Sequence, residues 1–282
     1  MLMLFVGACV TGAAPILVRV AGAGPAATGF WRLLFSLPLL AMLSWRSAGG
    51  VAAPSRLASL AGVAFALDLG FWHYGIANTS VAKATVLSNL TPVVVTAVAW
   101  LVLKQRPARL FVLAVALSVA GAWTMAIAKG TGAVGPNPAL GDALSLTTAI
   151  WYALYFLAVS AARQRQPATR VMFWSSLAGV PILLVAALSL REPLFPPTVL
   201  GWSACVALGV VHVAGQGSIA WALGRLPPAT ASVTVLVQPV VATILGWLLF
   251  GERLSTWQAL GAALALTGVV LAQRATARGT AS

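Results

Sequence analysis

The chain repeats one of its own segments. When residues 82–121 are aligned without gaps onto residues 229–268, a shift of 147 positions, 14 of the 40 residues are identical, including the pairs Pro92/Pro239 and Gly121/Gly268. Chance alone would give about one match in nine for a composition this biased, so the similarity indicates a duplicated unit. Both copies must therefore share one architecture.

A second block supports the same division of the chain. At a shift of 143, Phe30, Trp31 and Pro38 match Phe173, Trp174 and Pro181, and the four-residue difference between the two shifts falls in a loop between the blocks. We therefore predict two structural units, residues 1–133 and residues 134–282.

The composition identifies the solvent that each unit faces. The chain is 60% hydrophobic and 7% charged, with a mean hydropathy of +0.96, whereas a soluble domain carries about 25% charged residues. Runs of Leu and Ala lack the alternation of a membrane barrel, and an apolar helix of about 20 residues crosses a bilayer. We predict an all-α integral membrane protein with about ten transmembrane helices, near 3–20, 27–45, 57–76, 81–103, 108–128, 140–160, 170–190, 199–221, 229–250 and 256–273.

The basic residues carry information on orientation. The net charge is +13, yet the Lys and Arg side chains stand singly at helix ends instead of forming the basic face that binds nucleic acid. When the connections between the predicted helices are numbered along the chain, 11 Lys and Arg residues lie in the even connections and the C-terminus, and six lie in the odd connections. Positive loops stay inside, so both termini are predicted to be cytoplasmic in an inner or plasma membrane. The even set is Arg46, Arg56, Lys104, Arg106, Arg109, Arg163, Arg165, Arg170, Arg225, Arg274 and Arg278, and the odd set is Arg19, Arg32, Lys83, Lys129, Arg191 and Arg253.

Five helices in each copy have a geometric consequence. An odd number makes the second copy enter the membrane from the opposite side, so the two halves are inverted relative to one another. Inverted repeats are an architecture of secondary transporters, in which two halves rock around a site near the midplane. The first segment belongs to the repeat and lacks a small-residue cleavage site, so it is predicted to be a mature helix rather than a signal peptide.

These features resemble the drug/metabolite transporter superfamily, EamA type. Each copy has a Pro-containing helix, then Trp, then a basic turn: Thr91-Pro92-Val93-Val94, Trp100-Leu101 and Arg106 in the first, and Gln238-Pro239-Val240-Val241, Gly246-Trp247 and Gly251-Glu252-Arg253 in the second. The first copy lacks the Gly-Glu pair. The resemblance implies an exporter of amino acids and related metabolites, aromatic ones included. It also implies a central cavity enclosed by the first, third, fourth, sixth, eighth and ninth helices.

Two prolines are candidates for conformational hinges. Pro92 and Pro239 are predicted to lie mid-helix, where each removes a backbone hydrogen bond to the carbonyl four residues earlier. Asn89 and Gln238 lie within one turn of these kinks. Their amides are predicted to line the cavity, and the alternative is that they hydrogen-bond neighbouring helices together.

The ionisable residues inside the segments are the next candidates. Asp68 is central in the third segment and is followed by His73 and Tyr74. A carboxyl group inside the bilayer suits proton coupling, although a structural Asp that is neutral or paired with Arg is the alternative. Asp142, Glu192 and Glu252 map to helix ends or turns, where solvation explains them.

Two further pairs share helix faces. His212 and Gln216 are one turn apart on the eighth segment, and a bridge between helices is the alternative to a binding role. Trp151 and Tyr155 share one face of the sixth segment, beside Tyr152 and Thr148, and their central position favours a cavity wall over an interfacial belt. The predicted substrate contacts are therefore His73, Tyr74, Asn89, Trp151, Tyr155, His212, Gln216 and Gln238, with Asp68 as the candidate coupling residue.

The predicted site is asymmetric although its scaffold is repeated. At the 147 shift His73 corresponds to Ala220, His212 to Phe65 and Gln238 to Thr91, so the polar residues of one half have no counterparts in the other.

Several patterns indicate no further chemistry. Residues 130–135 spell GxGxxG, but no strand precedes them. No phosphate-binding loop is present, so neither a nucleotide cofactor nor ATP hydrolysis is predicted. Cys9 and Cys205 do not occupy matching repeat positions and are predicted to pack as small apolar residues, without a disulfide or a metal site.

The function predicted from the sequence is a secondary transporter. It exports small neutral or zwitterionic solutes, most simply amino acids, because apolar walls with a few hydrogen-bonding groups suit an amphipathic ligand. The alternatives are an integral-membrane enzyme acting on lipid-linked substrates, for which a cluster of acids and histidines is nearly absent, and a channel-like facilitator. The substrate, the coupling ion and the oligomeric state stay open at this point.

Overall fold

The computed structural model is helical wherever it describes regular structure. It describes all residues except 80, 103, 105, 129–135, 251–254 and 280–282, and gives only the backbone at 76–77, 81–83, 86, 250 and 278–279. The helices are α1 (Leu2–Thr11), α2 (Ala14–Ala21), α3 (Pro25–Ala48), α4 (Arg56–Asn78), α5 (Val81–Ser88), α6 (Thr91–Leu101), α7 (Arg109–Ala128), α8 (Pro138–Arg163), α9 (Ala168–Ser189), α10 (Val199–Val211), the π-helix η1 (His212–Gln216), α11 (Gly217–Leu223), α12 (Pro228–Thr234), α13 (Val237–Phe250) and α14 (Thr256–Gly279).

Local sequence determines where several helices begin and end. Pro25 is the first residue of α3, a position whose N–H needs no intrahelical partner. Asn137 and Thr198 cap α8 and α10, since their side-chain oxygens accept from the backbone N–H groups three residues on, at 3.2 Å and 3.0 Å. Gly22 and Gly49 end α2 and α3 in the left-handed conformation, which glycine adopts without strain.

The helices are long and apolar enough to cross a membrane. Among the described residues, nine helical segments of 20 to 26 residues meet that condition, and α6 is a shorter apolar helix. Together α5 and α6 cover the predicted fourth segment, so the predicted all-α membrane fold is confirmed. In each span's most apolar window only 28–50% of residues are buried inside the protein. The remaining apolar surface needs lipid around it.

Four of the predicted segments are interrupted rather than continuous. The first divides into α1 and α2, the fourth into α5 and α6, and the ninth into α12 and α13, while the eighth changes from α10 to the π-helix η1 and then to α11. Pro92 and Pro239 therefore do not lie in the middle of kinked helices. They occupy the second position of α6 and the third position of α13, directly after the interruptions.

The carbonyl groups next to these prolines find other partners. The Thr91 hydroxyl donates to the Ser88 carbonyl at 3.0 Å, and the Gln238 backbone N–H donates to the Val235 carbonyl at 2.9 Å. Buried backbone oxygens in a membrane require such partners. The chain can therefore break both helices at equivalent repeat positions without leaving these carbonyls unsatisfied.

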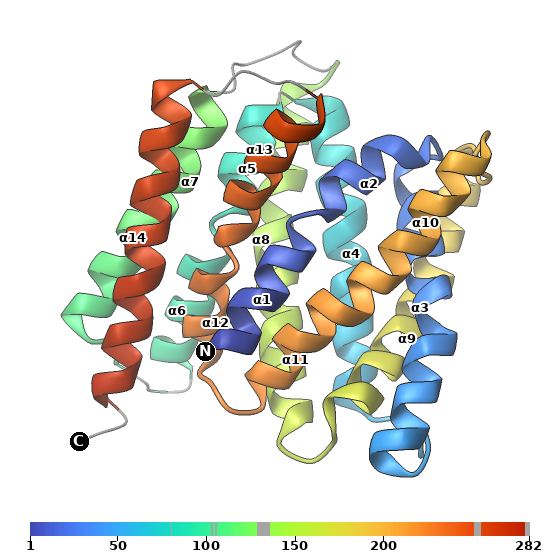
Figure 1. Ribbon diagram of the computed structural model, residues 1–282, viewed down its shortest axis with the longest axis horizontal. Coiled ribbons are helices and arrows are strands. Elements are labelled where there is room, and N and C mark those ends of the chain that lie inside the picture. Colours follow the sequence, from blue (N-terminus) through green and yellow to red (C-terminus); the bar gives the residue numbers. More distant parts are fainter. Residues whose placement is uncertain (80, 103, 105, 129–135, 251–254, 280–282) are drawn as a thin grey trace.

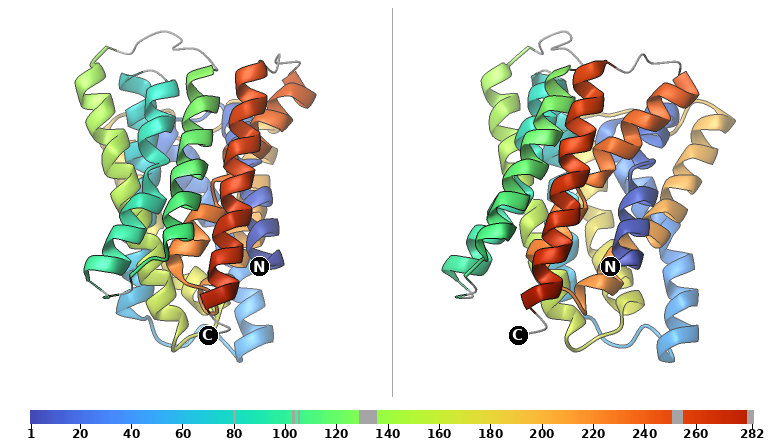
Figure 2. Two further views of the ribbon diagram at one scale, coloured as in Figure 1. Left: turned by 90° about the vertical axis from the view of Figure 1, so that its left-hand side faces the viewer. Right: turned by 60° about the vertical axis from the view of Figure 1, so that its left-hand side comes forward.

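Helices α7 and α14 pack against each other in a self-complementary way. A Cβ atom added to Gly121 of α7 would lie 2.5 Å from the Gly261 carbonyl oxygen of α14, and one added to Gly268 of α14 would lie 2.6 Å from the Ala114 carbonyl oxygen of α7. The 147 shift relates these two contacts, because it pairs Gly121 with Gly268 and Ala114 with Gly261. Reciprocal contacts of this kind are the mark of a two-fold relation. Figure 1 and Figure 2 show the two helices side by side at one end of the molecule.

Helices α3, α9 and α10 lie at the other end of the bundle (Figure 1). Helices α3 and α9, which also correspond under the repeat, pack together, and α4 packs against both α8 and α9 (Figure 1). The largest group of buried side chains joins α3, α4, α8, α9 and α11. The predicted boundary between residues 133 and 134 and the turn at Gly251-Glu252-Arg253 lie outside the described residues.

Candidate functional site

Six polar side chains from both halves meet in the interior of the bundle. We call this group the central polar cluster, and it consists of Arg32 (α3), Asp68 (α4), Tyr152 and Tyr155 (α8), and His212 and Gln216 (η1). Arg32 is the hub of this group, because it interacts electrostatically with Asp68, Tyr152, Tyr155 and His212. The first half thus supplies the arginine and the aspartate of the cluster, and the second half supplies its tyrosines, its histidine and its glutamine.

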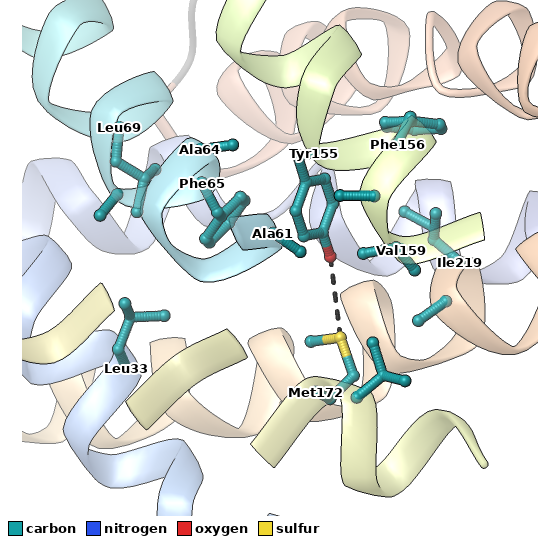
Figure 3. Packing of buried hydrophobic residues seen from close by; sticks show 14 of the residues in the cluster. Leu33, Ala61, Ala64, Phe65, Leu69, Tyr155, Phe156, Val159, Met172 and Ile219 are labelled. Carbon is teal, nitrogen blue, oxygen red and sulfur yellow. Dashed lines mark hydrogen bonds between the residues drawn. The ribbon is translucent and has the colours of Figure 1, made fainter. Parts of the chain in front are cut away.

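Gln216 connects the two tyrosines of the cluster. The Tyr155 hydroxyl donates to Gln216 Oε1 at 3.4 Å, and Gln216 Nε2 donates to the Tyr152 hydroxyl oxygen at 3.3 Å. The tyrosine rings are stacked, with centroids 5.8 Å apart and an interplanar angle of 4°. Figure 3 shows the Tyr155 hydroxyl pointing toward Met172, whose sulfur lies 3.7 Å away. The amide therefore fixes both phenol groups in one orientation.

The π-helix sets the positions of the second-half residues. His212 and Gln216 are the first and last residues of η1, and both are buried. They share a helix face, as the sequence predicts, but on a π-turn, a feature that often marks functional sites. His212 Nε2 lies 3.1 Å from the Ser176 hydroxyl of α9, and its Nδ1 atom is buried without a hydrogen-bond partner.

Arg32 was not predicted to belong to the site. The charge count assigned it to a connection between helices, which is wrong, because it lies within α3 and is 6% exposed. Its guanidinium group lies over the Phe65 ring, 5.5 Å from the centroid. Such a contact contributes about 2 kcal/mol or more when it is desolvated, and burying an ion costs several kcal/mol even after relaxation. The signal was available in the sequence, since residue 32 falls inside the predicted span 27–45.

Asp68 is brought to the cluster by α4. Its side chain is 9% exposed and interacts electrostatically with Arg32. Both interpretations of Asp68 from the sequence therefore stay open. An acid beside an arginine can be structural, and an acid within the membrane can carry a proton.

Four other predicted residues carry buried polar atoms, and two of them lie within range of the cluster. His73 is within electrostatic range of Arg32, and the Gln238 amide lies next to the Tyr152 hydroxyl. Trp151 packs edge-to-face on Phe71 at 6.1 Å, and Asn89 lies between α5 and α6. Nδ2 of Asn89 and Nε1 of Trp151 are buried and have no hydrogen-bond partner in the described structure, whereas the His73 ring interacts with the Leu69 backbone.

Unpartnered buried polar atoms require an explanation, because nearly all such groups in folded proteins are hydrogen-bonded. Here they concentrate on residues predicted to contact a solute. The arrangement therefore offers several donors to a polar ligand inside an apolar wall.

Tyr74 is the predicted residue that lies apart from the cluster. Its hydroxyl donates to Glu192 Oε1, while Glu192 Oε2 accepts from the Ala27 backbone N–H at 3.0 Å. Ala27 is in the first turn of α3, where a carboxylate is stabilised by the helix dipole. Glu192 is therefore not only a solvated turn residue, because it links α4 and the start of α3 to the connection between α9 and α10.

A separate cavity of about 400 Å³ lies between α6, α7, α12 and α14. None of the predicted contact residues lines it; its walls include Thr96, Arg106, Phe111 and Thr230. In the part of the chain that the structure describes, no group of three or more His, Cys, Asp or Glu residues is placed to hold a metal ion. Cys9 is partly buried and Cys205 is buried, and both are free thiols.

Comparisons with known proteins agree with the fold. Residues 1–127 and 139–273 match the model of the EamA-like transporter family. An uncharacterized transporter of Archaeoglobus fulgidus is 26% identical over 269 residues, which covers 95% of this chain and 93% of that protein. The uncharacterized transporter YwfM of Bacillus subtilis (strain 168) is 27% identical over 258 residues, covering 88% and 84%. A crystal structure aligns with a TM-score of 0.84 at 18% identity, covering 98% of this chain and 97% of the other; this last likeness concerns the fold alone.

Proposed function

We propose, because this chain belongs to the EamA-like transporter family, that it is a secondary transporter that exports small neutral or zwitterionic solutes, with amino acids as the leading class. The observation that carries the proposal is the central polar cluster. It joins a buried arginine, a buried aspartate and several neutral hydrogen-bonding groups in a largely apolar interior, which complements a small solute with both polar and apolar parts.

The proposed mechanism is alternating access. Residues from both halves contribute to the cluster, so a rocking motion of one half against the other changes the side from which the solute reaches it. The interruptions after Ser88 and Thr234 are the proposed hinges, since helix ends with few constraints absorb changes in backbone angles.

Removing either proline tests the hinges. Pro92→Ala and Pro239→Ala supply the missing N–H and favour a continuous helix, so each is expected to lower the maximal transport rate several-fold while substrate affinity changes little. Pro25→Ala, at the first position of α3, is the matched control and is expected to leave both unchanged. Transport rates and binding measured on the same purified variants separate the two quantities. A pure loss of affinity would show that the prolines shape the site instead.

The proposed orientation has both termini in the cytoplasm. Leaving out Arg32, which lies inside α3, changes the count of basic residues to 11 in even connections against 5 in odd ones, and positive connections stay inside. Reporter fusions at Arg106 and Arg165 are expected to read cytoplasmic, and a fusion at Gly132, outside the described residues, is expected to read external. An external C-terminal tag would contradict the orientation.

Solute identity and coupling can be tested on purified protein. A ligand that binds only the folded state raises the midpoint of thermal unfolding, so a panel of the twenty amino acids and related metabolites should reveal the class that binds. Uptake of each binding solute into proteoliposomes, with and without a pH gradient, then tests whether transport is coupled to protons, and the same comparison on Asp68→Asn tests whether Asp68 is the coupling residue. If no solute of the panel binds or is transported, the proposed substrate class is wrong.

A further inference from the structure

We infer that Arg32 is the anion-binding residue of the transport site, and that the transported solute must carry a carboxylate. This inference rests on the proposed function and narrows it, because neutral solutes without a carboxylate are then excluded. Arg32 was absent from the contacts predicted from the sequence, so the inference comes from its surroundings in the structure.

The guanidinium group of Arg32 has hydrogen-bond donors that no described residue satisfies. Nε and Nη2 of Arg32 are both buried, and neither has a hydrogen-bond partner among the described residues. These two nitrogens point along the same edge of the guanidinium plane, and this edge binds both oxygens of a carboxylate in a side-on, bidentate manner. The unpartnered pair is therefore the fork that a planar oxyanion would occupy.

Among the described residues, no side chain accepts hydrogen bonds from Nε and Nη2 of Arg32. The Phe65 ring covers one face of the guanidinium group and cannot accept two in-plane hydrogen bonds. Asp68 interacts with Arg32 electrostatically, but it leaves Nε and Nη2 without a hydrogen bond. Asp68 therefore lies within electrostatic range of Arg32 without filling the fork.

The side chains around the Arg32 guanidinium group are held in place by their neighbours. Phe65 packs against Tyr155 at 4.9 Å and His212 at 5.3 Å between centroids, and Figure 3 shows Phe65 and Tyr155 facing each other across the buried core. Because Gln216 and Met172 hold Tyr155 in turn, the platform beneath the guanidinium group is fixed. A preorganised donor pair binds an anion without first having to be ordered.

The groups around Arg32 indicate which features the solute has besides its carboxylate. With a carboxylate on Arg32, Asp68 is the acidic group of the cluster that can face a cationic part of the ligand, and the Tyr152 hydroxyl, which accepts from Gln216, can still donate a hydrogen bond. At the 143 shift Arg32 corresponds to Ser175, so the second half has no equivalent cation. The anionic end of the solute is therefore assigned to the first half.

The test compares matched solutes on the wild-type protein. L-leucine and L-phenylalanine are compared with their carboxamides and with the amines that lack the carboxyl group, by thermal unfolding and by uptake into proteoliposomes. The acids are expected to bind about 100-fold more tightly than the amides or amines, the range for losing one partner of a buried charged pair. Equal binding of acids and amides would overturn the inference and leave the proposed transport function standing.

Variants of Arg32 give the second readout. Arg32→Gln is expected to abolish this preference for acids, and Arg32→Lys to keep a reduced preference, since lysine retains the charge but not the fork. If Arg32→Gln does not fold, the comparison of acid and amide on the wild type decides alone. If the wild type binds and transports neither acids, amides nor amines, the proposed function fails and this inference fails with it. An unchanged preference in folded Arg32→Gln would also overturn it.

Discussion

Replacing Gly121 by Leu is expected to lower the midpoint of thermal unfolding by roughly 10 °C and to reduce the yield of folded protein sharply. The Cβ of any residue at this position would lie 2.5 Å from the Gly261 carbonyl oxygen, so α7 and α14 must separate. Overpacking against a rigid neighbour costs about 3 kcal/mol or more, and a protein of this size loses about 2–4 °C for each kcal/mol.

The repeat gives an equivalent prediction for the second half of the chain, and exposed residues of the same helices serve as controls. Gly268→Leu is expected to have the same effect, because the two-fold relation places it against the Ala114 carbonyl oxygen at 2.6 Å. Ala120→Leu and Ala263→Leu make comparable changes on the exposed faces of the same helices and are expected to leave the midpoint within about 2 °C. A stable Gly121→Leu protein would contradict the close packing of α7 on α14.

Replacing Gln216 by Leu is expected to weaken solute binding by about 10- to 100-fold while most of the protein remains folded. The substitution keeps the volume of the side chain but removes the amide that joins the Tyr152 and Tyr155 hydroxyls. Without the amide the two phenol groups are no longer held in place, and ordering each side chain on binding costs about 0.5–1.5 kcal/mol, where a factor of ten in affinity corresponds to about 1.4 kcal/mol. Binding of the best solute of the amino-acid panel is the quantity to measure.

Gln164→Leu is the matched control for this substitution. Gln164 follows α8 and is exposed, so the same chemical change there is expected to leave binding unaltered. If Gln216→Leu instead lowers the unfolding midpoint and leaves affinity intact, Gln216 only joins helices, which is the alternative that the sequence left open.

The sequence predicted the membrane fold well because its signals are long. Apolar runs of about 20 residues and a repeat spanning most of the chain depend on many residues at once, so a few misplaced boundaries do not alter the conclusion. The breaks at residues 89–90 and 235–236 escaped prediction in detail. A proline predicts a disturbance of the helix, but whether the helix kinks or stops depends on which group satisfies the freed carbonyl, and here Thr91 and Gln238 do so.

The members of the central polar cluster were predicted in part, and the differences have physical causes. Tyr155, His212 and Gln216 were chosen as polar groups on shared helix faces, and the structure brings them together. Arg32 was missed because it was counted as a loop charge, although a charge within a span is itself a signal of function. Tyr74 could not be placed from its spacing alone, since its partner Glu192 comes from the other half of the chain.

The measurement that tests the central claim most directly is counterflow in proteoliposomes. Vesicles containing the purified protein are loaded with an unlabelled amino acid of the panel, and a trace of the labelled compound is added outside. A carrier that binds one solute at a time between its two halves predicts a transient accumulation of label above its equilibrium level, and the Gln216→Leu protein should reduce that overshoot. Entry of label that rises steadily to equilibrium without an overshoot, and equally in both proteins, would contradict a binding site at the central polar cluster.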